Sequence, residues 1–514
     1  SSMILYRKKL LILFLGFICI SNSVLAQTPG FFKDLFVDSG VYITAMLYMH
    51  SAETLDLSIE YLSTSDTSLQ NSVIIQDEFD TNGHLLYPDG APRFRMIHTN
   101  GGSALHGQTL GEVGRNRIRS FYNSGGSYTG SCAGAFIASL HWQESGINEY
   151  YYHIWPGRTV DTYLGYSLTG HFIPESSPLL TYFDYGGDHY IDEITHEWGC
   201  YANEDVDYPD QTESLLQYDY PGMEMHEKIS TWAYKPDLIK GRIVVTGSHP
   251  ELALFGEGVQ MMQGMLLYAL DGTGQPQLKG SLANGVERLM IASTEDNRPS
   301  FARIGDRQYH HFSIEVPEEA ENLSIVLDGD DDYNFNLYLN PDSLAFQGSA
   351  EYESIEELSD HAIYTLNPSP TTWYVGVECE TTVESDGVDY SGNLEVLNGV
   401  AYSITATWDT PTAISSDKLS FPNEFTLDQN YPNPFNPTTT INYQIPQTSE
   451  VLLKVYSADG KQVTSLVNAR MPAGKYSVQW NGTNHTGEQV STGMYFARIE
   501  AGDFKQTIKM IYLR

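Results

Sequence analysis

The stretch Gly125-Gly-Ser-Tyr-Thr-Gly-Ser-Cys-Ala-Gly134 decides the fold of the N-terminal half of the chain. Residues 116–122 before it have the pattern of a helix end, and residues 135–141 after it have that of a new helix. A short strand that turns tightly into a helix places Cys132 at the helix N-terminus, where free N–H groups and the helix dipole favour a thiolate. The glycines fit a strained turn with closely passing backbones. The alternative interpretation is that Cys132 is only a small buried apolar residue.

A second stretch, Lys240-Gly-Arg-Ile-Val-Val-Thr-Gly-Ser-His-Pro-Glu251, favours the chemical interpretation. It is a β-branched strand followed at once by His249 and Glu251. Open α/β sheets keep their sites at the carboxyl ends of the strands, which is where this histidine falls. We therefore predict that Cys132 is a nucleophile, that His249 is its base, and that Glu251 orients and stabilises the imidazole.

These motifs resemble those of a known superfamily. Tyr128-Thr-Gly-Ser-Cys-Ala-Gly134 and Gly247-Ser-His-Pro-Glu251 resemble the two signatures of the class I glutamine amidotransferase-like superfamily, within it the group related to the N-terminal domain of biotin–protein ligase. Asn100-Gly-Gly-Ser103 and Tyr182-Phe-Asp-Tyr-Gly-Gly187 resemble further motifs of that group. The resemblance covers about residues 39–272. It implies a flavodoxin-like α/β fold and a catalytic triad made of the three residues named above.

The order of elements agrees with such a fold. We predict strands at 40–48, 72–76 and 92–98, and helices at 53–62 and 257–270. Alternation of strands and helices is typical of βαβ units and a parallel sheet. The sequence therefore predicts an α/β flavodoxin-like parallel-sheet domain over residues 27–275.

The glycine-rich loop after the strand at 92–98 is a candidate part of the site. Gly101 and Gly102 are placed to supply a backbone N–H that completes an oxyanion hole with the N–H of Ala133. Acyl transfer at a cysteine requires such donors. The alternative is an ordinary turn from strand to helix.

Residues 141–239 are rich in Tyr, Trp and His. A long insert on a rigid scaffold often builds the substrate pocket, and aromatic rings with acidic neighbours receive cationic or apolar side chains. It is equally consistent with a packed covering layer. Asp188-His189 and His196-Glu197 contain metal-ligating residue types, but two adjacent ligands specify little, and we predict no metal site here.

From about residue 282 the pattern changes to short alternating strands, which predicts an all-β sandwich over residues 282–410. Over about residues 296–409 it resembles the pre-peptidase C-terminal domain of secreted hydrolases. Four carboxylates, those of Asp328, Asp330, Asp331 and Asp332, lie within five positions and repel one another unless they are solvated or bind a hard cation such as Ca²⁺. The run lacks the features of an EF-hand loop. Calcium is the one cofactor considered for this chain.

The last domain, residues 420–514, follows a linker at 411–418. Its opening, Phe425-Thr-Leu-Asp-Gln-Asn-Tyr-Pro-Asn-Pro-Phe-Asn-Pro437, and its later strands resemble the C-terminal sorting domain of the type IX secretion system. The resemblance implies an immunoglobulin-like sandwich. It also implies an outer-membrane translocon as partner and a Gram-negative bacterium of the Bacteroidota type or a relative.

The start of the 514-residue chain and its charge agree with export. Residues 1–26 read as a secretory signal peptide with a basic start, an apolar run too short to span a membrane, and a cleavage site before Gln27. The remaining chain has 25 basic and 65 acidic residues, a net charge of −40, which argues against nucleic acid and anionic membranes as partners. No later stretch is apolar and long enough to span a membrane. We expect a secreted or cell-surface protein.

Two functions fit these features. The first is a secreted cysteine hydrolase that cleaves an amide or peptide bond of a small-molecule or peptide substrate through a thioester, since the chain has no synthase domain to receive ammonia. The second is a non-catalytic surface protein that binds a ligand or glycan on the same scaffold. Within the first, a carboxylate such as Glu78 or Asp188 is the alternative to Glu251 as the orienting group.

Overall fold

The computed structural model of the chain describes residues 30–38, 48–62, 80–142, 146–385, 390–409, 424–471 and 474–513. The signal peptide predicted at 1–26 and the strand predicted at 72–76 lie outside the described residues, as does all but the last residue of the strand predicted at 40–48. Contacts divide the chain into two compact units, Ser1–Ser359 with Ile363–Trp408, and Asp360–Ala362 with Asp409–Arg514. The residues predicted as the first two domains lie almost entirely in the first unit.

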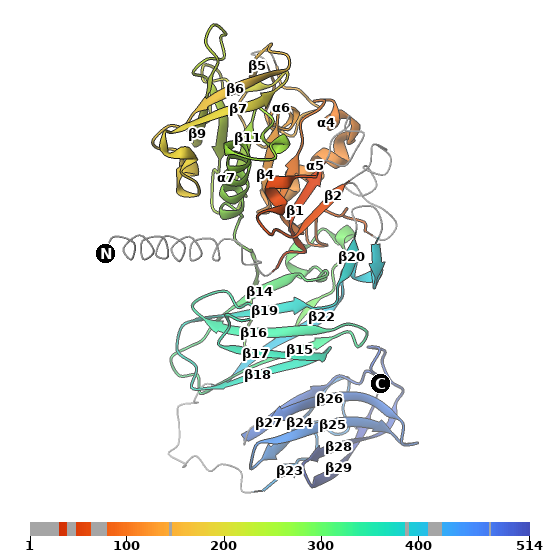
Figure 1. The fold of residues 1–514 in the computed structure, drawn as a ribbon. Helices are drawn as coiled ribbons and strands as arrows, with labels where there is room; N and C mark the ends of the chain where they lie inside the picture. Colours follow the sequence, from red (N-terminus) through yellow and green to blue (C-terminus); the bar gives the residue numbers. More distant parts are fainter. Residues whose placement is uncertain are drawn as a thin grey trace, which may run out of the picture. The chain divides into compact units, whose positions relative to one another are not determined.

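A nine-stranded sheet forms the first half of the first unit, in the order β2-β1-β3-β4-β11-β10-β9-β6-β7 (Figure 1). Its parallel strands are β1 (Lys33–Asp38), β2 (Ile59–Leu62), β3 (Phe94–Thr99), β4 (Ser127–Ser131) and β11 (Ile243–Thr246). Its antiparallel strands are β6 (Ser167–Phe172), β7 (Tyr190–His196), β9 (Thr212–Asp219) and β10 (Ile229–Tyr234). The insert predicted at 141–239 supplies the antiparallel strands, so the predicted all-parallel sheet is wrong for this half.

The helix predicted at 53–62 is also wrong. A short helix, α2 (His50–Glu53), ends at a turn, and β2 follows it. Asp56 has φ of 57°, a left-handed conformation that a helix interior does not contain. Ile59 then pairs with Leu35 of β1 in the parallel ladder. The edge pairing with β1 overrides the local helical pattern.

Helices cover both faces of the sheet. On one face α5 (Gly111–Asn123) and α6 (Ala133–Ala138) pack against apolar residues such as Ile97 and Val245. On the other, α7 (Glu257–Asp271) packs against Met96 and Val244. The alternation of strand side chains between the faces explains why neighbours in β11 belong to different cores. Further short elements are α4 (His106–Thr109), β5 (Thr159–Asp161), β8 (Cys200–Ala202), and the 3₁₀ turns Pro178–Thr181, Tyr185–Gly187, Pro250–Leu252, Thr294–Asp296, Pro299–Phe301 and Leu394–Asn398.

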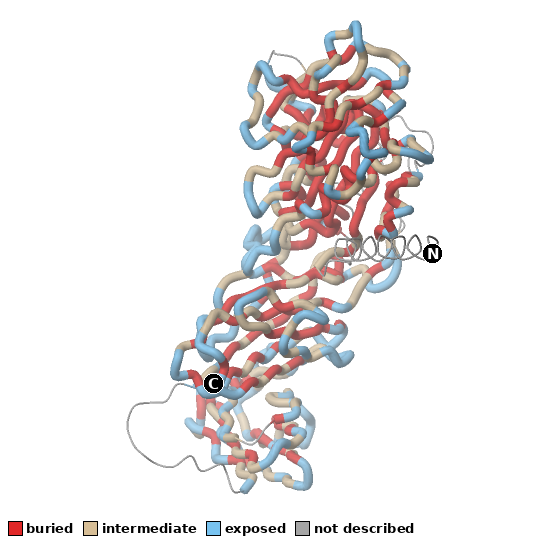
Figure 2. The backbone as a smooth tube through the Cα atoms, turned by 60° about the vertical axis from the view of Figure 1, so that its left-hand side comes forward, coloured by how far each residue is buried: buried red, intermediate tan, exposed pale blue. Residues whose placement is uncertain are grey.

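The second half of the first unit is a β-sandwich, as predicted. One sheet has the order β12-β14-β19-β16-β17 and the other β13-β22-β15-β18. The strands are β12 (Leu278–Ser281), β13 (Arg288–Met290), β14 (Tyr309–Glu315), β15 (Asn322–Gly329), β16 (Phe335–Pro341), β17 (Tyr352–Leu358), β18 (His361–Leu366), β19 (Thr372–Cys379) and β22 (Tyr402–Trp408), with a small hairpin of β20 (Val383–Ser385) and β21 (Tyr390–Gly392). Buried residues alternate with less buried ones along β15, β18 and β22, whereas β14 and β16 are buried over five consecutive residues (Figure 2).

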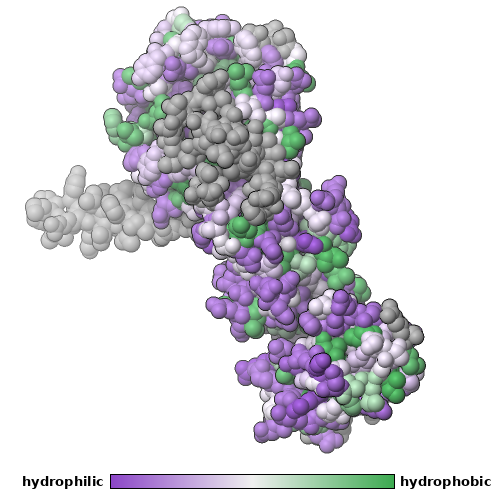
Figure 3. All heavy atoms as spheres, turned by 90° about the vertical axis from the view of Figure 1, so that its right-hand side faces the viewer, coloured by the Kyte–Doolittle hydropathy of each residue, from purple (hydrophilic) through white to green (hydrophobic). Residues whose placement is uncertain are grey.

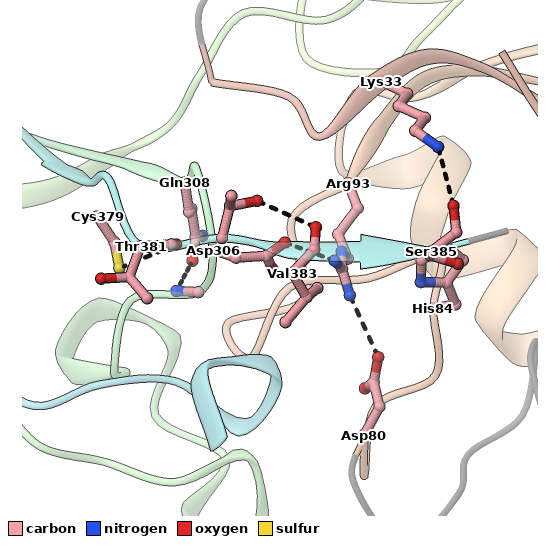
Figure 4. Close-up of polar contacts among 12 residues, drawn as sticks. Lys33, Asp80, His84, Arg93, Asp306, Gln308, Cys379, Thr381, Val383 and Ser385 are labelled. Atoms are coloured by element: carbon pink, nitrogen blue, oxygen red, sulfur yellow. Dashed lines mark hydrogen bonds and ion pairs between the residues drawn. The ribbon is translucent and has the colours of Figure 1, made fainter. Parts of the chain in front are cut away.

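Buried charges join the sandwich to the nine-stranded sheet (Figure 4). The Arg93 guanidinium, 1% exposed, donates to Asp306 at 2.8 Å and to Asp80 at 3.4 Å. Lys33 donates to the backbone carbonyl of Ser385 in β20 at 3.3 Å. Because these partners come from both halves, the two halves fold as one compact unit.

The second unit is also a β-sandwich, as predicted. Its three-stranded sheet is β23 (Thr426–Leu427), β24 (Thr439–Ile445) and β27 (Gly474–Trp480), and its four-stranded sheet is β25 (Ser449–Ser457), β26 (Gln462–Met471), β28 (Gly493–Ala501) and β29 (Phe504–Tyr512). Counting both units, the described chain is mostly β-sheet with few helices. Hydrophilic side chains cover most of the face drawn in Figure 3, and hydrophobic ones form small groups. Among the helices of the described residues, none has the length and apolar content to cross a membrane.

Candidate functional site

Cys132 lies in the turn between β4 and α6 with a backbone that only tertiary contacts can hold. Its φ is 47° and its ψ is −103°, a region that residues with a β-carbon rarely adopt. Its N–H donates to the Thr246 carbonyl of β11 at 2.9 Å, and its carbonyl accepts from Ala135 and Phe136. The helix that follows covers residues 133–138, so it begins directly after Cys132 and ends earlier than the predicted 135–141.

Two glycines make this turn feasible. A β-carbon on Gly130 would lie 2.7 Å from the Gly134 carbonyl carbon, and one on Gly134 would lie 2.3 Å from the Thr99 carbonyl oxygen. Neither position can carry a side chain without moving backbone. The close approach of α6 to β3 and β4 therefore fixes the position of Cys132.

His249 follows β11 at the same edge of the sheet. Its N–H donates to the Thr195 carbonyl at 2.8 Å, and its Nδ1 lies 2.9 Å from Oε1 of Glu251. The side chains of His249 and Glu251 are 12% and 2% exposed. Glu251 belongs to the 3₁₀ turn Pro250–Leu252, which folds the carboxylate back onto the ring.

The electrostatics of this pair keep the imidazole charged. Burial alone would lower the pKa of His249, but the Glu251 carboxylate and a hydrogen bond with Cys132 raise it to about 11. Burial alone would raise the pKa of Glu251, but the charge and hydrogen bond of His249 lower it, with smaller contributions from His98 and Ser131. The structure thus brings Cys132, His249 and Glu251 together.

The predicted oxyanion loop lies beside these residues. A β-carbon on Gly101 would lie 2.1 Å from Cε1 of His249 and 3.4 Å from Cβ of Cys132. Gly102 has φ of 145° and open space around it. Within the described part of the chain, no acceptor takes a hydrogen bond from the N–H of Gly101, Gly102 or Ala133. These three amides are therefore available to an oxyanion near Cys132.

A buried hydrogen bond between side chains anchors that loop. His106 Nε2 lies 2.6 Å from Oδ2 of Asp38, and both side chains are at most 2% exposed. The Asn100 N–H also donates to the Asp38 carbonyl at 3.2 Å. The end of β1 thereby holds both ends of the segment that contains Gly101 and Gly102.

The sequence did not predict what covers the thiol. Sγ of Cys132 lies 3.4 Å from the backbone carbonyl oxygen of Glu197 and 3.8 Å from that of Trp198. Cys132 is 4% exposed as a result. A β-carbon on Gly199 would lie 1.8 Å from the Gly247 carbonyl oxygen, so this covering segment packs directly on the loop that precedes His249.

His196, considered in the sequence as a metal ligand, instead anchors the covering segment. Its Nε2 lies 2.8 Å from the Thr162 hydroxyl and its Nδ1 lies 3.2 Å from the Ser248 hydroxyl. Burial lowers its pKa to about 4, with a contribution from the charge of His249, so the ring is neutral at physiological pH. Hydroxyl partners on both nitrogens give His196 a structural role.

The other predicted candidates lie elsewhere. Asp188 accepts a hydrogen bond from the Tyr190 N–H at 3.2 Å, whereas Glu251 is the carboxylate on His249; Glu78 lies outside the described residues. Tyr163, Tyr166 and Trp198 of the insert are largely exposed, at 63%, 73% and 57%.

No group of three or more His, Cys, Asp or Glu side chains placed to hold a metal occurs in the described residues, the aspartates at 328–332 included. Asp330 and Asp331 instead accept hydrogen bonds from the Asp332 N–H and the Ser359 hydroxyl. No cofactor is predicted for this chain, and calcium at this run stays the alternative.

Comparison by sequence relates only the end of the chain to a known family. Residues 433–503 match the FlgD Ig-like domain, which agrees with the sandwich of the second unit. No curated protein matches the chain in sequence.

Comparison with solved structures gives weak likenesses. The pre-peptidase C-terminal domain of a collagenase from Bacillus anthracis is 9% identical, with 26% of this chain and 100% of that chain covered and a TM-score of 0.17. Dimeric latent PorU from Porphyromonas gingivalis is 12% identical, with 68% and 30% covered and a TM-score of 0.16. A β-glucuronidase from Faecalibacterium prausnitzii is 12% identical, with 40% and 36% covered and a TM-score of 0.15. The chain spans about a third of the length of the last two. TM-scores of this size support no inference about activity.

Proposed function

We propose that the first unit is a cysteine hydrolase that cleaves an amide or peptide bond with Cys132 as nucleophile, His249 as base and Glu251 as orienting group. The observation that carries the proposal is the position of His249, which interacts with the Glu251 carboxylate and with the Cys132 side chain at once. The strained backbone of Cys132 is a second support, because such strain is typical of nucleophiles on strand-to-helix turns.

The same observations support a scaffold of the class I glutamine amidotransferase-like type. Five parallel strands carry Cys132 and His249 at their carboxyl ends, and helices cover both faces. A flavodoxin-like core extended by an antiparallel insert accounts for this arrangement. The assignment is a proposal because it rests on the motifs alone and not on a relative found by sequence comparison.

The geometry allows a two-step reaction. The Cys132 thiolate, beside the protonated imidazole of His249, attacks the substrate carbonyl carbon. The N–H groups of Gly101, Gly102 and Ala133 bind the oxyanion that forms. His249 then gives its proton to the leaving amine, which departs and leaves a thioester on Cys132. A water molecule gives a proton to the neutral His249 and attacks the thioester, and the carboxylic acid leaves as the thiolate and the imidazolium are restored.

Water is the acceptor we favour over an ammonia-using synthase. The signal peptide and the sorting-domain motif favour export through a type IX translocon to the cell surface or beyond, where water is the acceptor at hand. The carbonyls of Glu197 and Trp198 cover one side of Sγ. The scissile carbonyl therefore enters from the side of Gly101 and Ala133.

Iodoacetamide alkylation of the full chain, followed by mass spectrometry, tests the proposal. We expect Cys132 to react at neutral pH much faster than Cys200 and Cys379, which are fully buried and whose pKa values burial raises well above the usual range. The His249→Ala variant must react far more slowly at Cys132 at neutral pH. Equal reactivity of the three cysteines, or a rate at Cys132 that His249→Ala leaves unchanged, would overturn the proposal.

A non-catalytic binding protein is the second candidate. Two observations favour it: Cys132 is 4% exposed beneath the segment 197–199, and Tyr163, Tyr166 and Trp198 are exposed in the insert. Exposed aromatic rings often bind apolar, cationic or sugar groups. The alkylation experiment separates the candidates by the rate at Cys132 itself, since a relic cysteine should react as fast in His249→Ala as in the unmodified chain.

A further inference from the structure

Buried polar atoms without partners gather beneath the proposed triad. Among the described residues they include Nε2 of His98, both amide atoms of Asn100, the Ser131 hydroxyl and Oε2 of Glu251. Each of these residues is at most 3% exposed. Buried polar groups are normally paired, so such a cluster in one place needs a physical reason.

The sheet register explains why these atoms meet. His98 of β3 lies opposite Thr129 of β4, and its Nδ1 lies 2.8 Å from the Thr129 hydroxyl. Ser131 is two residues further along β4 and so shares that face of the sheet. A β-carbon on Gly101, which follows β3, would lie 2.1 Å from Cε1 of His249, so the imidazole and the Glu251 carboxylate that it contacts lie at the ends of β3 and β4. The effect of His98 and Ser131 on the pKa of Glu251 agrees with this placement.

We propose that His98 is a positioning residue for the triad: its Nε2–H holds the second carboxylate oxygen of Glu251 through one water bound by Asn100 and Ser131. His249 occupies the first oxygen. The carboxylate is then fixed at both ends and cannot rotate away from the imidazole. This inference rests on the proposed hydrolase function, because it concerns the group that orients the base.

The tautomer that this role needs agrees with the hydrogen bonds. The role needs the tautomer in which the Thr129 hydroxyl, 2.8 Å from Nδ1 of His98, donates to that nitrogen and not to the Ile97 carbonyl 3.4 Å away. Nδ1 is then the acceptor, and the single proton of the neutral ring is on Nε2. Burial lowers the pKa of His98 to about 4, opposed in part by Glu251, Asn100 and Asp38, so the ring stays neutral in the working range.

The charged groups around this cluster are few. Asp38 of β1 acts on His98, while His249 and Cys132 interact with each other on the far side of Glu251. A donor that favours the ionised carboxylate lets Glu251 keep its charge to lower pH. Without the His98 donor, Glu251 takes up a proton at a higher pH. The neutral Glu251 no longer stabilises the imidazolium of His249 below that pH.

The test is the pH dependence of Cys132 alkylation by iodoacetamide in the full chain. In His98→Phe we expect the acid limb of the rate profile to move to higher pH by about one unit, equivalent to a tenfold change in proton affinity. His98→Asn, which keeps an N–H donor, should restore part of the shift. A shift in His98→Phe that His98→Asn partly restores supports the inference.

A matched control separates positioning from packing. His311 in the second half of the first unit is also fully buried, and both its ring nitrogens lack partners in the described chain. His311→Phe should leave the acid limb in place. If the acid limb of the pH–rate profile stays in place in His98→Phe and Cys132 is still selectively alkylated, this inference is overturned. The hydrolase proposal is then left intact. Equal alkylation rates of Cys132, Cys200 and Cys379 in the unmodified chain would overturn the hydrolase proposal itself.

Discussion

Two regions of the first unit each bury a cation, with different consequences. Where the sandwich meets the nine-stranded sheet, Arg93 lies between Asp306 at 2.8 Å and Asp80 at 3.4 Å. At the candidate site, His249 lies between the Glu251 carboxylate at 2.9 Å and the Cys132 side chain. An arginine does not lose its proton in a protein, whereas a histidine does.

The difference lies in which partners exchange protons. Both partners of Arg93 are carboxylates, so the group can only hold the two halves of the unit together (Figure 4). One partner of His249 is a cysteine, whose proton the ring can hold so that the sulfur is left as a nucleophile. Changes at Arg93 should therefore alter stability alone, and changes at His249 should alter reactivity first.

The largest expected effect is on stability at Arg93. Arg93→Met leaves the buried carboxylates of Asp80 and Asp306 without their cation, which costs about 3–5 kcal/mol. We expect the first unit to unfold at a correspondingly lower urea concentration, while any protein still folded keeps selective alkylation of Cys132.

Arg298→Met is the control for this comparison. Arg298 pairs with Asp296 at 3.5 Å, and the two side chains are 58% and 50% exposed. Removal of such a surface pair should change stability by less than about 1 kcal/mol. If both variants lose the same stability, the buried contact is not what joins the halves.

The second effect is on reactivity at His249. Without the imidazolium, Cys132 in His249→Ala becomes an ordinary thiol. An ordinary thiol is less than about 1% ionised at pH 6, so alkylation there should slow by about a hundredfold. Quenched alkylation assays at pH 6 and pH 9 measure this rate. The rates of the variant and of the unmodified chain should converge at pH 9. A uniform loss at both pH values would indicate a damaged fold instead.

The third effect is steric. Gly101→Ala places a β-carbon 2.1 Å from Cε1 of His249, so the ring must move. We expect alkylation of Cys132 at pH 6 to slow by about tenfold, because the ring is displaced but still present. Gly493→Ala is the control, since its nearest neighbour would lie at 3.8 Å. Unchanged alkylation in Gly101→Ala would mean that the glycine does not face the site.

The sequence predicted the parts of the site that depend on local chemistry. Cys132 between small residues and His249 directly after an apolar strand are patterns that need only the chain near them. β2 was missed because residues 59–62 become a strand only by pairing with β1. The antiparallel strands of the insert were missed for the same reason, since their order β10-β9-β6-β7 is set by partners far apart in the chain.

The cover over the thiol was beyond sequence reasoning for a different reason. Glu197 and Trp198 contact Cys132 through backbone carbonyls, which every residue type possesses. In the sequence, the side chain of Glu197 suggested a metal ligand and that of Trp198 an aromatic pocket. Neither side chain indicated that the backbone covers Cys132. His98 offered a weak signal at most, because a histidine at a strand end is often only packed, and its neighbours at Ser131 and Glu251 come together only in the folded sheet.

The smallest effect concerns how stability depends on pH at Glu251. The folded-state pKa of His249 is raised from 6.5 to about 11, so its contribution is fully present below pH 6.5 and is lost as the pH rises toward 11. The pKa of Glu251 is lowered from 4.5, so its contribution is present above pH 4.5 and is lost as the pH falls. The pair should therefore stabilise the first unit most between pH 4.5 and 6.5.

Glu251→Gln should lower the unfolding free energy there by about 2 kcal/mol, the typical value for a hydrogen bond to a charged group. The deficit should shrink as the pH is raised toward 11, whereas Arg93→Met should show no such recovery because its cation does not titrate. Urea unfolding of both variants at pH 5.5 and 9.5 makes the comparison, and a deficit in Glu251→Gln that grows with pH would show that His249 is buried neutral and that the two regions differ less than their geometry indicates.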